Sequence, residues 1–124
     1  MNQVNYDEIG KQFATQYYQA LQTCRASIGA FYHEQARMTY EGVEVIGREN
    51  ISQKLQGIKC NTLQVALTSV DTHPSDNSLL ILVCGQLKSD DDHPLPFSEV
   101  FMLSLINESF LICNSMFRLN LHHF

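Results

Sequence analysis

The sequence predicts an α+β fold in which N-terminal helices pack in a bent, mainly antiparallel sheet. Two changes along the chain indicate this order. In the first third, apolar residues recur every three to four positions, as on an amphipathic helix. From Asn61 onward they alternate with polar or small residues, as in strands with one buried face. Short turn segments separate the later apolar runs, so we expect an antiparallel meander that curves around the helices.

Three helices are expected before Asn61. The first spans 6–23, because apolar residues lie four positions apart at Ile9, Phe13, Tyr17 and Leu21. Ser27 can cap a short second helix over 28–32. The third spans 49–56, where Ile51 and Leu55 share a face and Gly57 ends the helix.

A hairpin is expected before the third helix and four longer strands after it. The hairpin joins 37–40 to 43–46 through a Glu41-Gly42 turn. Turn residues separate the later strands, at 73–77, 90–96 and 107–109. The four strands themselves are expected near 63–69, 79–87, 97–106 and 110–121. Connections this short favour antiparallel neighbours.

Length and composition predict one domain over 1–124. The chain has 44% hydrophobic residues, with seven Phe and five Tyr, which supply a core without a disulfide or metal. Its four cysteines form no close pair, so we expect buried, reduced side chains in an intracellular protein: Cys24, Cys60, Cys84 and Cys113. Neither a signal peptide nor a membrane span is expected.

Charge argues against nucleic acid as a partner, histidine placement argues against a metal, and no cofactor is expected. The formal net charge is -5, and the eight Lys and Arg residues are dispersed rather than clustered on a phosphate-binding surface. His122 and His123 are adjacent, so in a strand they point to opposite faces, and no third ligand lies nearby in the sequence. An acidic surface suits a basic protein partner.

Short motifs spread over residues 6–124 resemble the nuclear transport factor 2 family. They occur in the family's order and spacing. The motifs are Phe13-x-x-x-Tyr17-Tyr18-Gln19, Ala30-Phe31-Tyr32, Thr39-Tyr40-Glu41-Gly42, Ile51-x-x-Lys54-Leu55, Gly85-Gln86-Leu87-Lys88-Ser89-Asp90-Asp91-Asp92 and Asn114-Ser115-Met116-Phe117-Arg118-Leu119-Asn120-Leu121-His122. The Gly-Gln-Leu-Lys run and the Phe-Arg-Leu-x-Leu-His ending are specific to the transport factor within its wider fold family.

The resemblance implies a cone-like fold with a hydrophobic cavity at its wide end and a homodimer formed through the sheet. It further implies a carrier rather than an enzyme. Such a carrier binds the small GTPase Ran in its GDP form, takes an aromatic residue of the Ran switch II region into the cavity, and returns Ran to the nucleus. Binding to Phe-x-Phe-Gly repeats of nucleoporins would place it in the cytoplasm, the nucleus and the nuclear pore.

The resemblance also assigns candidate site residues. Those facing Ran are Tyr40, Glu41, Asp90 and Asp92. The cavity is expected to be lined by Ile58, Leu63, Leu95, Phe97 and Phe117, for which ordinary core packing is the alternative. Tyr6 and Phe124 are expected to bind nucleoporin repeats, unless they only pack at the chain ends. Met116 is expected in the dimer interface, or otherwise in the core of one chain.

The three adjacent aspartates, Asp90 to Asp92, have other readings. They could be a solvated loop, a guard against aggregation at a strand end, or a calcium loop. Calcium is disfavoured because the Gly and the distal Glu of an EF-hand are missing. In an extended stretch alternate residues share a face, so Asp90 and Asp92 are expected to face one partner and Asp91 to point away.

Two departures and two rival functions remain open. The family usually has Trp where this chain has Tyr6 and Tyr40, and the smaller ring predicts weaker binding there. The same cone houses small-molecule isomerases and dehydratases, which place an acid or His inside the pocket. The cavity wall expected here is wholly apolar, and Asp71 and Glu99 are unconvincing exceptions. The other rival is a partner domain that heterodimerises with an export factor.

Overall fold

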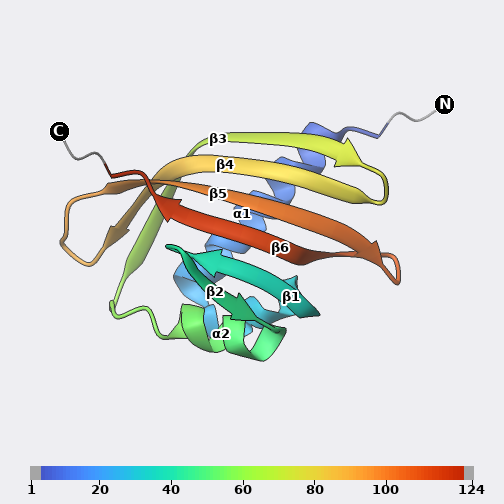
Figure 1. Ribbon diagram of the computed structural model, residues 1–124. Coiled ribbons are helices and arrows are strands. Elements are labelled where there is room, and N and C mark those ends of the chain that lie inside the picture. The colour runs from blue at the N-terminus through green and yellow to red at the C-terminus, as the bar shows by residue number, and fades with distance from the viewer. Residues whose placement is uncertain (1–3, 122–124) are drawn as a thin grey trace.

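The computed structural model describes residues 4–121, which form two α-helices, one 3₁₀ helix and a six-stranded sheet (Figure 1). The helical part and first strands are α1 (Tyr6–Thr23), η1 (Arg25–Phe31), β1 (Tyr32–Tyr40), β2 (Val43–Ile46) and α2 (Arg48–Gln56). The later strands are β3 (Leu63–Ser75), β4 (Ser78–Ser89), β5 (Leu95–Ile106) and β6 (Ser109–Leu119). This order confirms the predicted α+β fold class.

The sheet is a meander extended by one parallel pair. Its strand order is β2-β1-β6-β5-β4-β3, with antiparallel pairing from β3 to β6 and between β1 and β2. β1 and β6 are parallel. The long strands curve together across one side of α1, while α2 packs beside β1 and β2 (Figure 1). The opposite face of the sheet carries no helix among the described residues.

α1 lies close against the sheet because its sequence permits it. Asn5 caps the helix by accepting a hydrogen bond from the Glu8 backbone N–H at 3.1 Å. A Cβ at Gly10 would lie 1.7 Å from Thr72 Oγ1, so only glycine allows this approach of α1 to β3. Further along, Tyr17 stacks edge-on to Phe101 of β5, with ring centroids 5.0 Å apart. The helix thereby brings its aromatic face to the centre of the core.

Several element boundaries and one helix cap predicted from the sequence were wrong. The second helix is the 3₁₀ helix η1, and Ser27 lies within it and donates to the Cys24 carbonyl at 2.8 Å instead of capping it. β3 and β4 extend into the predicted turn, which shrinks to Asp76 and Asn77. Asp76 adopts a φ of 54°, a backbone conformation that Asp tolerates in tight turns.

The cysteines are free but not fully buried. Cys24 is exposed, and Cys60, Cys84 and Cys113 are half-buried, so the expectation of four core thiols was wrong. Between residues 4 and 121 no helix is long and apolar enough to cross a membrane. Nor do the side chains of that range gather three or more His, Cys, Asp or Glu residues in a metal-binding arrangement. His122 and His123 lie outside the described residues.

Candidate functional site

A cavity of about 200 Å³ opens between α1, α2 and the concave face of the sheet. All five residues predicted to line it do so: Ile58, Leu63, Leu95, Phe97 and Phe117. Phe97, Phe117 and Leu63 are buried, whereas Leu95 is 37% exposed and Ile58 is half-buried. The cavity therefore has a buried inner wall and a more accessible mouth.

Tyr40 forms one aromatic side of this cavity. Its ring stacks on Phe117, with centroids 4.8 Å apart and planes inclined by 13°. Phe117 in turn stacks on Phe97 at 5.6 Å. The ammonium of Lys54 in α2 lies 5.4 Å from the centre of the Tyr40 ring. Tyrosine at the family's usual Trp position is thus held by partners on two elements.

Glu99 corrects the expectation of a wholly apolar wall. Its side chain lines the cavity and is only 4% exposed. The Tyr18 hydroxyl donates to Glu99 Oε1 at 2.7 Å. Burial raises the pKa of the Glu99 carboxyl to about 8, although the Tyr18 hydrogen bond acts in the opposite direction. Asp71, the other acid considered, is exposed on β3.

The signal for Glu99 was present in the sequence. It lies two residues from both Phe97 and Phe101, so alternation along β5 places all three on the same face. The residues missed from helix α1 are Tyr17 and Tyr18, whose hydroxyls would have been natural partners for a buried carboxyl.

Glu41 connects the β1–β2 hairpin to β6. It adopts a φ of 50° and Gly42 a φ of 83°, the left-handed pair that a two-residue hairpin turn requires. One carboxylate oxygen, Oε1, accepts a hydrogen bond from the backbone N–H of Leu119, which lines the cavity. Its own backbone N–H donates to Phe117 at 3.0 Å. Glu41 is therefore fixed beside the cavity.

Asp90 is also fixed by its own chain. Its Oδ1 accepts backbone hydrogen bonds from Asn61 at 2.9 Å and Thr62 at 2.8 Å, and these bonds lower the pKa of the Asp90 carboxyl. This anchors the β4–β5 connection to the start of β3. The connection joins Ser89 to Leu95, both of which line the cavity.

The expected alternation of the three aspartates was wrong. Asp90 has a φ of 51° and the Asp92 N–H donates to the Ser89 carbonyl at 3.0 Å, so the run forms a turn rather than an extended strand. Asp91 and Asp92 are both exposed. The backbone therefore does not support the expectation that Asp91 points away from the side that Asp90 and Asp92 face.

Tyr6 lies far from the cavity. It begins α1, is 37% exposed, and lines a shallow surface depression with Thr72 and Pro74 near the end of β3. The cavity instead contacts Leu63 at the start of β3, about 30 Å away along an extended strand. Phe124, predicted with Tyr6, lies outside the described residues.

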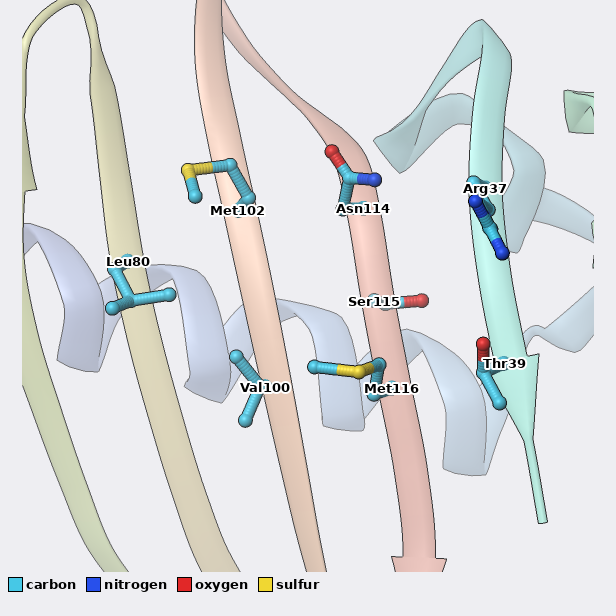
Figure 2. A pocket seen from close by; sticks show the side chains of 8 residues that line it. All are labelled: Arg37, Thr39, Leu80, Val100, Met102, Asn114, Ser115 and Met116. Carbon is cyan, nitrogen blue, oxygen red and sulfur yellow. The ribbon is translucent and has the colours of Figure 1, made fainter. Parts of the chain in front are cut away.

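Met116 lies on the outer face of the sheet and is 55% exposed, so it does not belong to the core of a single chain. It lines a groove of about 280 Å³ with apolar side chains from β4 and β5. Figure 2 shows Leu80, Val100, Met102 and Met116 projecting to the same side of the strands, with α1 behind them.

A bent sheet that closes a mostly apolar cavity against N-terminal helices defines the class of cone-shaped α+β folds. Within this class, residues 9–119 match the nuclear transport factor 2 (NTF2) domain. A probable nuclear transport factor 2 of Caenorhabditis elegans is 35% identical, covering 96% of each chain. The chain belongs to the nuclear transport factor 2 family.

Solved structures agree with this assignment. Ntf2 from Cryptosporidium parvum superimposes with a TM-score of 0.88 at 39% identity, covering 95% of this chain and all of that one. A putative dehydratase of the NTF2-like family from Streptomyces avermitilis gives a TM-score of 0.81 at 12% identity, covering 95% of this chain and all of that one. The second likeness shows the fold alone. The named relatives support a role in nuclear transport over an enzymatic one.

Proposed function

We propose that the chain is a nuclear import carrier that binds the small GTPase Ran in its GDP form and Phe-x-Phe-Gly repeats of nucleoporins. The observation that carries the proposal is an aromatic-walled cavity bordered by acidic segments, in a member of the nuclear transport factor 2 family. An apolar hole flanked by acids suits an aromatic anchor with basic neighbours. In this proposal, Ran in its GDP form inserts an aromatic residue of its switch II region into the cavity.

The acids beside the cavity are suited to bind a basic partner because two of them are already ordered. Glu41 and Asp90 each use one oxygen to accept backbone hydrogen bonds within the chain. Among the described residues, their second oxygens form no hydrogen bond. Ordered side chains lose less conformational entropy on association. Asp92, exposed in the neighbouring turn, supplies a third charge.

The outer face of the sheet is the proposed dimer interface. Leu80, Leu82 and Met116 are each at least 40% exposed there. Two copies related by a two-fold axis would bury the same apolar patch from both chains. The rival reading, a partner domain that heterodimerises with an export factor, would use the same face, and equilibrium sedimentation of the purified chain separates the two because only a homodimer forms from one component.

Tyr6 is proposed to bind Phe-x-Phe-Gly repeats, together with Phe124. The ring of Tyr6 is partly exposed beside Pro74, where a phenylalanine side chain of a repeat can pack. Since this surface is separated from the cavity along both α1 and β3, Ran and a nucleoporin repeat can bind at the same time.

Glu99 is the observation that favours an enzymatic function. A small-molecule isomerase or dehydratase would use an acid inside the pocket, and Glu99 is such an acid. However, its raised pKa keeps it protonated at neutral pH, where it is a hydrogen-bond donor and a poor base. The carrier reading therefore stands first.

A pull-down tests the carrier reading. Immobilised protein is incubated with Ran loaded with GDP or with a non-hydrolysable GTP analogue. We expect retention of the GDP form and little of the other. Equal retention of both nucleotide forms, or retention of neither form, would overturn the proposal. Consumption of an enolisable ketone by the protein, lost in Glu99→Gln, would favour the enzyme instead.

A further inference from the structure

The cavity is not wholly apolar, because a carboxyl group is buried in its wall. Glu99 projects from β5, and its neighbours across the strands are Val83 and Phe117. The side chains of these two neighbours cannot form a hydrogen bond with a carboxyl group. Within the described residues the Tyr18 hydroxyl is the one hydrogen-bond partner of Glu99, and it occupies Oε1.

The second oxygen of Glu99, Oε2, forms no hydrogen bond among the described residues. Buried side-chain oxygens that are fully enclosed and unpartnered occur at Thr72 and Ser115, and Glu99 Oε2 is not among them. Since Oε2 has no partner in the described chain, its remaining accessible surface borders the cavity that Glu99 lines. A polar atom in such a position is stabilised by a well-placed hydrogen bond from a ligand.

The cavity has room for a small molecule beside this group. A dry apolar cavity of roughly 150 Å³ can hold benzene. At about 200 Å³, this one accommodates a single ring with a short substituent. Aromatic side chains from β1, β5 and β6 supply flat walls for that ring: Tyr40, Phe97 and Phe117.

We propose that this cavity binds small, mostly apolar carbonyl compounds of about one ring, with the carbonyl oxygen accepting a hydrogen bond from Glu99 Oε2. Tyr18 donates to Oε1, so a proton on the carboxyl group resides on Oε2 and points to the ligand. This ligand class goes beyond Ran transport and does not depend on it. A bound molecule would occupy the space proposed for an aromatic residue of Ran.

The surroundings of Glu99 favour the protonated form at neutral pH. Burial raises its pKa to about 8, and no Lys, Arg or His is among the groups that shift it. The titratable groups coupled to it are four tyrosines, Tyr17 and Tyr18 of α1 and Tyr32 and Tyr40 of β1. Burial raises the pKa of each tyrosine, so all four hydroxyls stay neutral while Glu99 titrates.

The test compares acetophenone with ethylbenzene, which lacks the carbonyl but keeps the ring. Binding of each to the full chain is measured by NMR titration of cavity resonances at pH 6 and pH 9.5. At pH 6 we expect acetophenone to bind about three- to tenfold more tightly. At pH 9.5 the Glu99 carboxylate repels the carbonyl oxygen, so this preference should disappear.

Two variants identify the responsible group. Glu99→Gln keeps an N–H donor, so its preference for acetophenone should persist and no longer depend on pH. Tyr18→Phe combined with Glu99→Leu removes the carboxyl group and its hydrogen-bond partner, so this variant should bind the two compounds equally. Equal binding by the wild type at pH 6, absence of binding by either compound, or a preference that does not change with pH in the wild type would each overturn the proposal. If the double variant does not fold, the pH profiles of wild type and Glu99→Gln decide alone.

Discussion

The acids beside the cavity differ in what their carboxylates bind, and this difference predicts different effects of substitution. Asp92 is exposed, and among residues 4–121 its side chain forms no hydrogen bond or ion pair. We expect Asp92→Asn to change the free energy of unfolding by no more than about 0.5 kcal/mol. Its affinity for Ran-GDP should fall by about thirty-fold or more, because a partner charge is left without a counter-ion.

Asp91→Asn in the same turn is the matched control, measured by calorimetric titration of Ran-GDP. A smaller loss for Asp91 indicates a specific pair at Asp92. Equal losses in the two variants would reduce the effect to the general field of the loop. Equal affinities of both variants and the wild type would remove the aspartates from the site.

Asp90, unlike Asp92, is expected to contribute to the stability of the fold. Its carboxylate holds the Asn61 and Thr62 backbone N–H groups, which Ala cannot do. We therefore expect Asp90→Ala to lower the Tm, while Asp92→Ala leaves it nearly unchanged. Because the pKa of Asp90 is lowered in the fold, this stabilisation is present near neutral pH and is lost in acid as the carboxyl is protonated. Matching Tm values for the two variants would refute the anchoring role.

Glu99 should make stability depend on pH in the opposite direction. Its pKa is about 8 in the fold, against an ordinary value of 4.5, so between these values the folded state holds a proton that the unfolded state has released. Stability therefore falls as pH rises through this window, by at most about 5 kcal/mol, and levels off above pH 8. Urea unfolding at fixed protein concentration should show this slope in the wild type and a flatter one in Glu99→Gln. Parallel curves would contradict a buried, protonated Glu99.

The outer sheet face predicts the oligomeric state. Met116→Glu places a charge in a proposed apolar interface, where it would be desolvated without a partner. Analytical ultracentrifugation at micromolar concentration should show a dimer for the wild type and for Met116→Leu, and a folded monomer for Met116→Glu. A monomeric wild type would contradict the interface.

The start of α1 predicts that the two binding surfaces are independent. Tyr6→Ala removes a partly exposed ring about 17 Å along the helix from the cavity residues Tyr17 and Tyr18. Affinity for a Phe-x-Phe-Gly peptide should fall, with affinity for Ran-GDP unchanged. Comparable losses for both ligands would show damage to the fold rather than a separate site.

Elements with strong periodicity could be predicted from the sequence, and contacts between distant segments could not. The spacing from Ile9 to Leu21 gave α1 because it sets a buried helical face. Nothing local revealed that Asp90 would bond to Asn61 and Thr62, since that contact depends on β3 and β4 pairing. The turn at 90–96 was predicted, but the conformation of the aspartates within it was not, because their composition fits a loop without fixing its φ angles.

At the scale of the whole molecule, the fold separates three surfaces: the cavity mouth, the outer sheet face and the start of α1. Each is proposed to bind a different partner, which would allow the carrier to hold Ran while it contacts the pore. If the three surfaces act separately, binding of Ran must depend on the cavity alone. A substitution that fills the cavity mouth should abolish cargo binding and spare the other two surfaces.

Calorimetric titration of Ran, loaded with GDP or with a GTP analogue, into the wild type and Leu95→Trp tests the central claim most directly. Leu95 is partly exposed at the cavity mouth, so Trp can enter the cavity without disturbing the buried core. We predict that the wild type binds Ran-GDP at least about thirty-fold more tightly than the GTP form, a difference of about 2 kcal/mol. Folded, dimeric Leu95→Trp should bind neither form. Equal affinity of the wild type for both nucleotide states, or undiminished binding of Ran-GDP by Leu95→Trp, would contradict a GDP-selective carrier that uses this cavity.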